Sequence, residues 1–131
     1  MKVVIVEVGK KARIEDIEGS LENMQKIVGG YITATYPFKD QVAIVCDDEG
    51  AYKHPINRWI DKGVTAPTGI FGTFFICGLT EEDFGDLTDA QARKYVKLFK
   101  YPEGFIKMNN KVYRVRIGSK EPPAFICEGG S

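Results

Sequence analysis

The sequence is poor in the residues and runs that mark several classes of protein. Its 131 residues include three cysteines and one histidine. Cys46, Cys77 and Cys127 are too few and too widely spaced for a disulfide framework or a zinc site, whose ligands come in close pairs. No apolar run approaches the roughly 20 residues that span a bilayer, and Glu7 interrupts the apolar N-terminus before any signal-peptide cleavage site. We therefore expect a cytoplasmic protein with no metal, no cofactor and no membrane span.

Net charge is also absent, because 18 Lys and Arg residues balance 18 Asp and Glu residues. This balance does not support nucleic acid or an anionic membrane as the partner. Gly69, Gly72 and Gly78 lack the Lys-Ser/Thr pair and the strand-to-helix context of a phosphate-binding loop. The length, and the lack of repeats and linkers, predict a single domain over residues 1–131.

Apolar periodicity and turn residues predict the following elements. A hairpin is expected at 3–8 and 12–17, and an antiparallel pair of strands at 31–36 and 41–46. Further strands are expected at 70–77, 111–117 and 124–127, and a long ordered loop at 51–68. One helix is expected at 21–28, a short acidic helix from 80 onward, and a longer helix from 88 to 100.

Together these elements predict an α+β fold, in which helices pack on one face of a mainly antiparallel, mixed sheet. Their periods also predict one shared core. Its expected members are Val4, Val6, Ile14, Val28, Ile32, Ile44, Ile70, Phe74, Ile76, Tyr95 and Phe99.

Catalytic signals are weak. Cys46 with His54 and Asp47 forms the best candidate for a nucleophilic site, but nothing nearby in the sequence activates the thiol. We therefore favour a protein that is not an enzyme. Two basic groups form a candidate strip for phosphate, provided that they lie together: the helix side with Arg93, Lys94, Lys97 and Lys100, and the strand face with Arg114 and Arg116. A solvated face is the alternative explanation.

One segment concentrates the side chains that suit recognition. His54, Asn57, Arg58 and Trp59 bring an imidazole, an amide, a guanidinium and the single Trp into one predicted loop. We predict that this loop forms a binding surface with Tyr31 and Thr73. In the alternative account, Asn57 caps a turn and Arg58 pairs internally with Asp47, Asp48 or Asp61.

The order of several short motifs resembles an uncharacterised family, numbered 3846 in the domain-of-unknown-function series. The resemblance covers residues 1–100, and the strand extension at 101–127 departs from it. The motifs that carry the resemblance are Gly29-Gly30-Tyr31-Ile32, Tyr36-Pro37-Phe38, Pro55-Ile56-Asn57-Arg58 and Gly72-Thr73-Phe74-Phe75-Ile76-Cys77-Gly78.

The resemblance implies a protein of bacteriophages, plasmids or other mobile elements that acts in the host cytoplasm. The leading hypothesis is a small non-enzymatic binding protein that inhibits a host defence system by binding a host protein. One alternative is a protein that binds and sequesters a nucleotide-like signal, and another is a structural or replication accessory protein. The sequence does not specify the oligomeric state.

Overall fold

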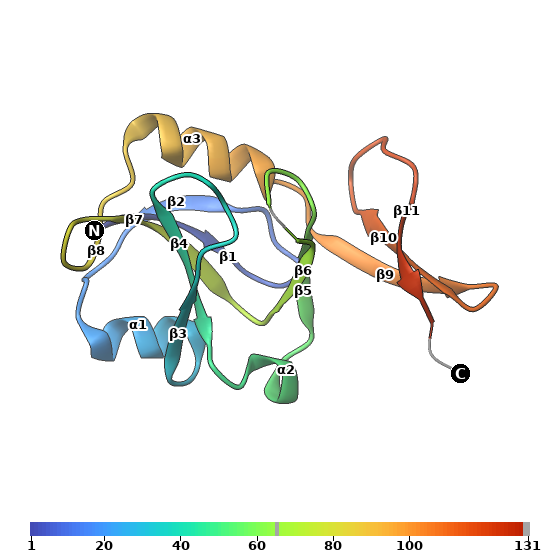
Figure 1. Cartoon of the computed structure of the whole chain (residues 1–131), viewed down its shortest axis with the longest axis horizontal. Helices are drawn as coiled ribbons and strands as arrows, with labels where there is room; N and C mark the ends of the chain where they lie inside the picture. Colours follow the sequence, from blue (N-terminus) through green and yellow to red (C-terminus); the bar gives the residue numbers. More distant parts are fainter. Residues whose placement is uncertain (65, 130–131) are drawn as a thin grey trace.

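The computed structural model describes residues 1–64 and 66–129, and its centre is an antiparallel sheet (Figure 1). The predicted hairpin at the N-terminus is confirmed, because β1 and β2 pair in antiparallel fashion. The predicted pairing of β3 with β4 is confirmed as well. The strands of this sheet are β1 (Lys2–Val6), β2 (Arg13–Asp16), β3 (Ile32–Thr35), β4 (Val42–Asp47), β7 (Phe74–Leu79) and β8 (Phe84–Gly85), in the order β2-β1-β7-β4-β3 with β8 beside β7.

The three central strands are buried on both faces of the sheet. Along β7, Phe74 and Ile76 point into one hydrophobic cluster, whereas Phe75 and Cys77 point into another. Strands β1 and β4 alternate in the same way, since successive side chains of a strand face opposite sides. The single core predicted from the sequence is therefore wrong. Val28 belongs to the second cluster and Ile32 packs against it, while Ile14 is 46% exposed.

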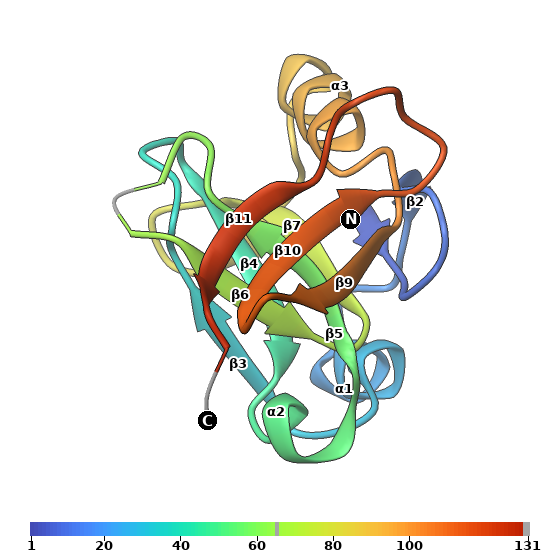
Figure 2. The same ribbon diagram turned by 90° about the vertical axis from the view of Figure 1, so that its right-hand side faces the viewer.

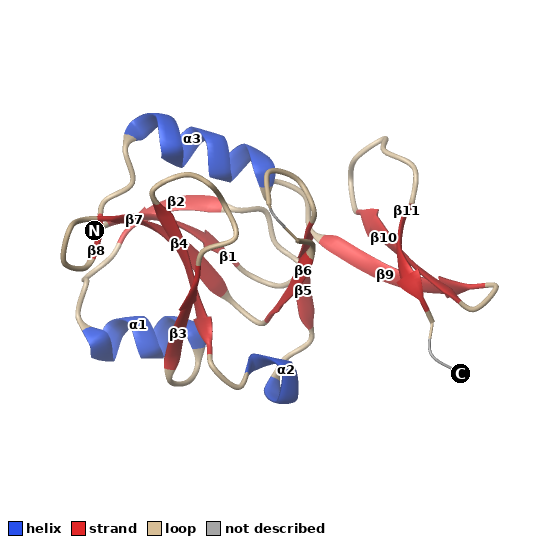
Figure 3. Cartoon of the chain, viewed as in Figure 1, coloured by secondary structure: helices blue, strands red, loops and turns tan. Residues whose placement is uncertain are grey.

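Each face of the sheet is covered by its own helix. Helix α3 (Asp89–Leu98) packs against the first cluster through Ala92 and Tyr95, and α1 (Leu21–Val28) packs against the second through Met24 and Val28. The two helices lie on opposite sides of the sheet in Figure 3.

The predicted fold class, α+β with a mixed sheet and helices on one face, is consequently wrong. The chain is mostly β, all its strand pairs are antiparallel among the described residues, and its helices are short. The physical reason is the apolar character of β1, β4 and β7, because strands that are apolar on both faces need a cover on both.

Helix α1 has the predicted bounds, and α3 begins at the predicted cap but ends at Leu98, two residues before the predicted end. The Ser20 hydroxyl accepts the N–H of Asn23 at the start of α1, and Gly29 ends this helix at φ +83°. Thr88 and Gln91 form the predicted capping box of α3.

Two smaller sheets accompany the central one. Strands β5 (Ile56–Ile60) and β6 (Thr68–Phe71) form a pair, and a three-stranded sheet of β9 (Glu103–Met108), β10 (Lys111–Arg116) and β11 (Ala124–Glu128) extends from the end of α3 (Figure 2). The loop predicted at 51–68 is therefore wrong. Helix α2 (Gly50–Lys53) and β5 occupy its first part, and its residue Thr65 lies outside the described residues.

The predicted acidic helix after Thr80 is also wrong. The Thr80 hydroxyl accepts the backbone N–H of Asp83 at 3.0 Å, and the Thr80 N–H donates to the Asp83 carbonyl at 2.8 Å. These two bonds close a tight turn, a local arrangement that competes with a helix. The chain then enters β8. Strand β9 had no counterpart among the predicted elements.

Candidate functional site

Asn57 and Arg58, the centre of the predicted recognition loop, are buried in β5. Their exposed fractions are 1% and 0%. The Asn57 amide donates to the carbonyls of Val6 and Gly72, each at 2.9 Å. Asn57 thus joins the two-stranded sheet to the central one. The role of Asn57 and Arg58 in binding stays a prediction. A partner cannot reach these two side chains in this conformation, because both are buried.

Arg58 binds carbonyl oxygens and does not pair with the acids considered for it. Its Nη2 donates to the carbonyls of Lys10 at 2.7 Å and Phe99 at 3.1 Å, and its Nη1 donates to Asn57 Oδ1 at 2.7 Å. Burial lowers the pKa of the Arg58 guanidinium to about 10, while the nearby charge of Glu103 raises it. The side chain therefore stays charged at neutral pH and holds the β1–β2 turn against the end of α3.

His54 belongs to a second polar cluster, centred on Asp47. The Asp47 carboxylate lies 2.9 Å from His54 Nε2 and 2.9 Å from Lys53 Nζ, and it accepts the N–H of Glu49 at 2.9 Å. Burial acts to raise the pKa of this carboxyl, but these hydrogen bonds outweigh it and hold the pKa at about 2. The cluster fastens α2 to the end of β4.

This cluster predicts an acid-dependent loss of stability. Because the folded pKa of Asp47 lies below its ordinary value of 3.8, the carboxylate stabilises the fold above that value. The contribution, about 2 kcal/mol, is lost as the pH falls from about 4 through about 2. Asp47→Asn should lower the free energy of unfolding at pH 6 by about this amount and flatten the decline below pH 4. Urea unfolding of this variant and of the exposed neighbour variant Asp48→Asn checks it. Equal loss in both variants would contradict the role of Asp47.

The remaining predicted residues lie in separate places. Tyr31 is 77% exposed and borders a shallow hollow beside Asp47. Thr73 lines a groove between β2 and α1, and Trp59 faces a narrow gap beside Glu103. The six residues therefore do not form one surface: Tyr31 and His54 both lie beside Asp47, whereas Asn57 and Arg58 are buried together.

The structure does not build the alternative Cys46–His54 site. Cys46 and Asp47 are successive residues of β4, so their side chains face opposite sides of the sheet. Cys46 packs against the cluster under α3, while Asp47 holds His54. Burial, followed by the charges of Asp47 and Asp48, raises the pKa of the Cys46 thiol and disfavours the reactive thiolate.

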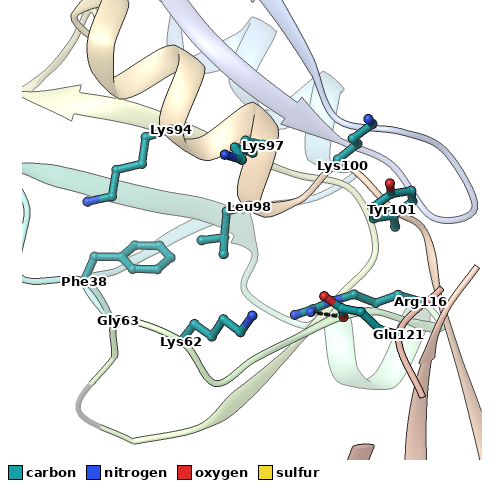
Figure 4. A pocket seen from close by; sticks show the side chains of 10 residues that line it. All are labelled: Phe38, Lys62, Gly63, Lys94, Lys97, Leu98, Lys100, Tyr101, Arg116 and Glu121. Atoms are coloured by element: carbon teal, nitrogen blue, oxygen red, sulfur yellow. Dashed lines mark hydrogen bonds and ion pairs between the residues drawn. The ribbon is translucent and has the colours of Figure 1, made fainter. Parts of the chain in front are cut away.

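A larger site lies where α3 meets the C-terminal sheet. It is a cleft of about 540 Å³, which we call the basic cleft (Figure 4). Its lining residues come from the 37–41 turn, the β5–β6 connection, the end of α3 and the β10–β11 region. They are Phe38, Lys62, Gly63, Lys94, Lys97, Leu98, Lys100, Tyr101, Arg116 and Glu121.

The floor of the basic cleft is apolar. Phe38 is 8% exposed, and its ring packs against Tyr95 with centroids 5.0 Å apart and against Phe99 at 6.4 Å. Leu98 adds an aliphatic surface, and Tyr101 lies on the wall towards the C-terminal sheet (Figure 4). The rings of Tyr95 and Phe99 therefore hold Phe38 in place.

The rim of the basic cleft is strongly positive. Lys94 is 3.7 Å from Asp40 Oδ2, Lys100 lies over the Tyr101 ring at 5.3 Å, and Arg116 pairs with Glu121. Lys62 and Lys97 have no ion-pair partner within the described part of the chain. Five cations and one carboxylate therefore line the cleft.

The predicted basic strip is divided by the fold. Lys97 and Arg116 come together in the basic cleft, although they are distant in sequence. Arg93 is exposed on α3 and does not line the cleft, and Arg114 is 6% exposed with its Nη1 3.1 Å from Asp61 Oδ2. Sequence reasoning assigned no role to Lys62 or Glu121, which come from connecting segments with no distinguishing pattern.

Comparison with protein families shows the family to which the chain belongs. The model of the family described as Domain of unknown function (DUF3846) matches residues 1–100. The chain belongs to this family, as its motifs suggested. No curated protein and no solved structure matches it. Tyr101, Arg116 and Glu121 lie outside the matched range, so the basic cleft combines the family's domain with the C-terminal extension. Among the described residues, no helix is long and apolar enough to cross a membrane.

Proposed function

We propose that this protein is a non-enzymatic binding protein whose basic cleft takes a nucleoside polyphosphate or a closely similar molecule. The observation that carries the proposal is the pairing of an apolar, aromatic floor with a rim of five cations. An aromatic base fits the apolar floor, and phosphate groups fit the positive rim. The cleft volume of about 540 Å³ lies within the range of small-ligand sites.

The chemistry of the lining supports binding without turnover. Among the described residues that line the cleft there is no Ser, Thr, Cys or His, and the one carboxylate among them, that of Glu121, pairs with Arg116. Sequestration of a nucleotide signal needs only affinity. As the wider role we propose a mobile-element protein that counters a host defence system, which is what the family resemblance implies. The alternative to sequestration of a nucleotide signal is capture of a host protein.

Binding of ATP should depend on Lys62 and Lys97. Lys97→Gln and Lys62→Gln should each weaken ATP binding by about fivefold, because each removes one charge-assisted contact with phosphate. Isothermal titration calorimetry measures the effect. The matched control is Arg93→Gln, which removes an exposed positive charge outside the cleft from α3, the helix that also carries Lys97. Equal affinity in the wild type and both lysine variants would contradict the proposal.

The aromatic wall should distinguish ATP from phosphate alone. Tyr101→Ala should weaken ATP binding about tenfold, since stacking of a base on an aromatic ring contributes about 1–3 kcal/mol. Inorganic tripolyphosphate, which has no ring, should bind the wild type and this variant equally. A parallel loss for both ligands would show that Tyr101 acts on the phosphate side or on the fold, and would exclude a base at this wall.

A further inference from the structure

The basic cleft already holds one anionic group, the side chain of Glu121. This residue lies between β10 and β11, and its carboxylate pairs with Arg116 Nη1 inside the cleft (Figure 4). Its side chain is 50% exposed, so it borders the open space that a ligand would enter. Carboxylate and phosphate bind the same planar fork of a guanidinium. Glu121 and a bound phosphate would therefore compete for one partner.

The local sequence keeps Glu121 in this position. Pro122 follows it and restricts its backbone to extended conformations. The Glu121 N–H donates to the Ser119 hydroxyl at 3.1 Å, and the Ser119 N–H donates to the Arg116 carbonyl at 3.2 Å. Strand β10 ends at Arg116, and the loop that follows it folds back so that the Glu121 carboxylate meets the Arg116 side chain.

Arg116 has a second acidic neighbour that cannot leave in the same way. Glu103 Oε2 lies 3.7 Å from Arg116 Nε, and the Glu103 side chain is only 4% exposed. Its Oε1 also accepts the Trp59 N–H at 2.8 Å, which fixes it between β9 and β5. Of the two carboxylates, only Glu121 faces solvent and can move aside while the C-terminal sheet stays in place.

We infer that Glu121 is an internal competitor for the anionic ligand: its carboxylate occupies the position on Arg116 that a phosphate group takes in the complex. The inference rests on the proposed function of the basic cleft. It makes Glu121 a residue that sets affinity, because a ligand gains Arg116 only by releasing this carboxylate. The C-terminal extension, which lies outside the family match, then supplies both Arg116, which contacts the ligand, and Glu121, which competes for that contact.

Calorimetric titration of the full chain with ATP tests the inference. Glu121→Gln should strengthen binding about fivefold, since it removes a competing charge from a partly exposed ion pair. The matched control Glu22→Gln, on α1 at the opposite face of the sheet, should leave affinity unchanged. In an Arg116→Gln background, Glu121→Gln should give no gain, because the shared partner is absent.

Each outcome separates this inference from the proposed function. Wild-type binding with no gain in Glu121→Gln overturns the competitor role and leaves the cleft as the ligand site. A gain that persists in the Arg116→Gln background also overturns it, because the effect would then be general electrostatics. Binding by Glu121→Gln alone supports the competitor role in its strongest form. No binding by the wild type or by Glu121→Gln overturns both claims. If the Arg116→Gln variant does not fold, the ATP affinities of Glu121→Gln and Glu22→Gln decide the question: a gain in Glu121→Gln alone supports the competitor role, and equal affinities overturn it.

Discussion

Arg58→Ala is expected to lower the free energy of unfolding by about 3–4 kcal/mol. The variant removes three short donor contacts from a fully buried guanidinium and leaves the carbonyls of Lys10 and Phe99 without these donors. The loss should be large because these carbonyls lie on two different elements, the β1–β2 turn and the end of α3. Arg58 is therefore a tie between segments that are far apart in sequence.

Urea unfolding of Arg58→Ala measures this effect, with Arg93→Ala as the matched control. Arg93 is exposed on α3, so its replacement should change stability by about 0.5 kcal/mol or less. A cost below about 1 kcal/mol for Arg58→Ala would contradict the buried network. Such a result would return Arg58 to the candidates for ligand recognition.

Phe74→Ala should cost about 3–5 kcal/mol, the range for removal of a buried aromatic ring from a packed core. Phe74 is 0% exposed on β7, and its ring meets Phe99 edge-on with centroids 5.4 Å apart. The cavity would open between the central sheet and α3. Because the end of α3 also supplies Lys97 and Leu98 to the basic cleft, the variant should weaken ATP binding as well.

Chemical denaturation of Phe74→Ala should be compared with that of Phe125→Ala. Phe125 is 53% exposed on β11, so its truncation should cost less than about 1 kcal/mol. Similar denaturation midpoints for the two variants would contradict the position of Phe74 in the first hydrophobic cluster.

Local signals in the sequence predicted much of the secondary structure. Ser20, Gly29 and the Thr88–Gln91 box set the limits of α1 and α3, because capping depends on residues within one turn. The hairpin of β1 and β2 was also predictable from neighbouring residues, because two apolar runs flank a short turn that contains Gly9. The covering of both faces was also encoded, since β1, β4 and β7 carry consecutive apolar residues rather than a strict alternation. The prediction nevertheless placed both covering helices on one face of the sheet, which leaves the other apolar face without a cover.

The polar residues of β5 could not be placed from local sequence. Asn57 and Arg58 look like surface residues, yet their acceptors include Val6, Lys10 and Phe99, which are 41 to 51 residues away. Only the folded chain brings these carbonyls together. Asn57 and Arg58 stand between the apolar residues of β5, and in that setting buried polar side chains form hydrogen bonds inside the protein.

The candidate site was partly visible. Lys94, Lys97 and Lys100 recur at helical spacing before Tyr101, which indicates a positive helix end beside an aromatic ring. The other half of the basic cleft comes from Lys62, Arg116 and Glu121, whose meeting with α3 depends on how the C-terminal sheet packs. Sequence spacing carries no information on that packing.

The central claim is that the basic cleft binds a nucleoside polyphosphate, and an amide chemical-shift titration with ATP tests it most directly. We expect saturable shifts at Gly63, Leu98 and Tyr101, with little change at Asp47 or along α1 on the opposite face of the sheet. Absence of saturable shifts at millimolar ATP, or shifts centred on the Asp47 cluster, would contradict the account.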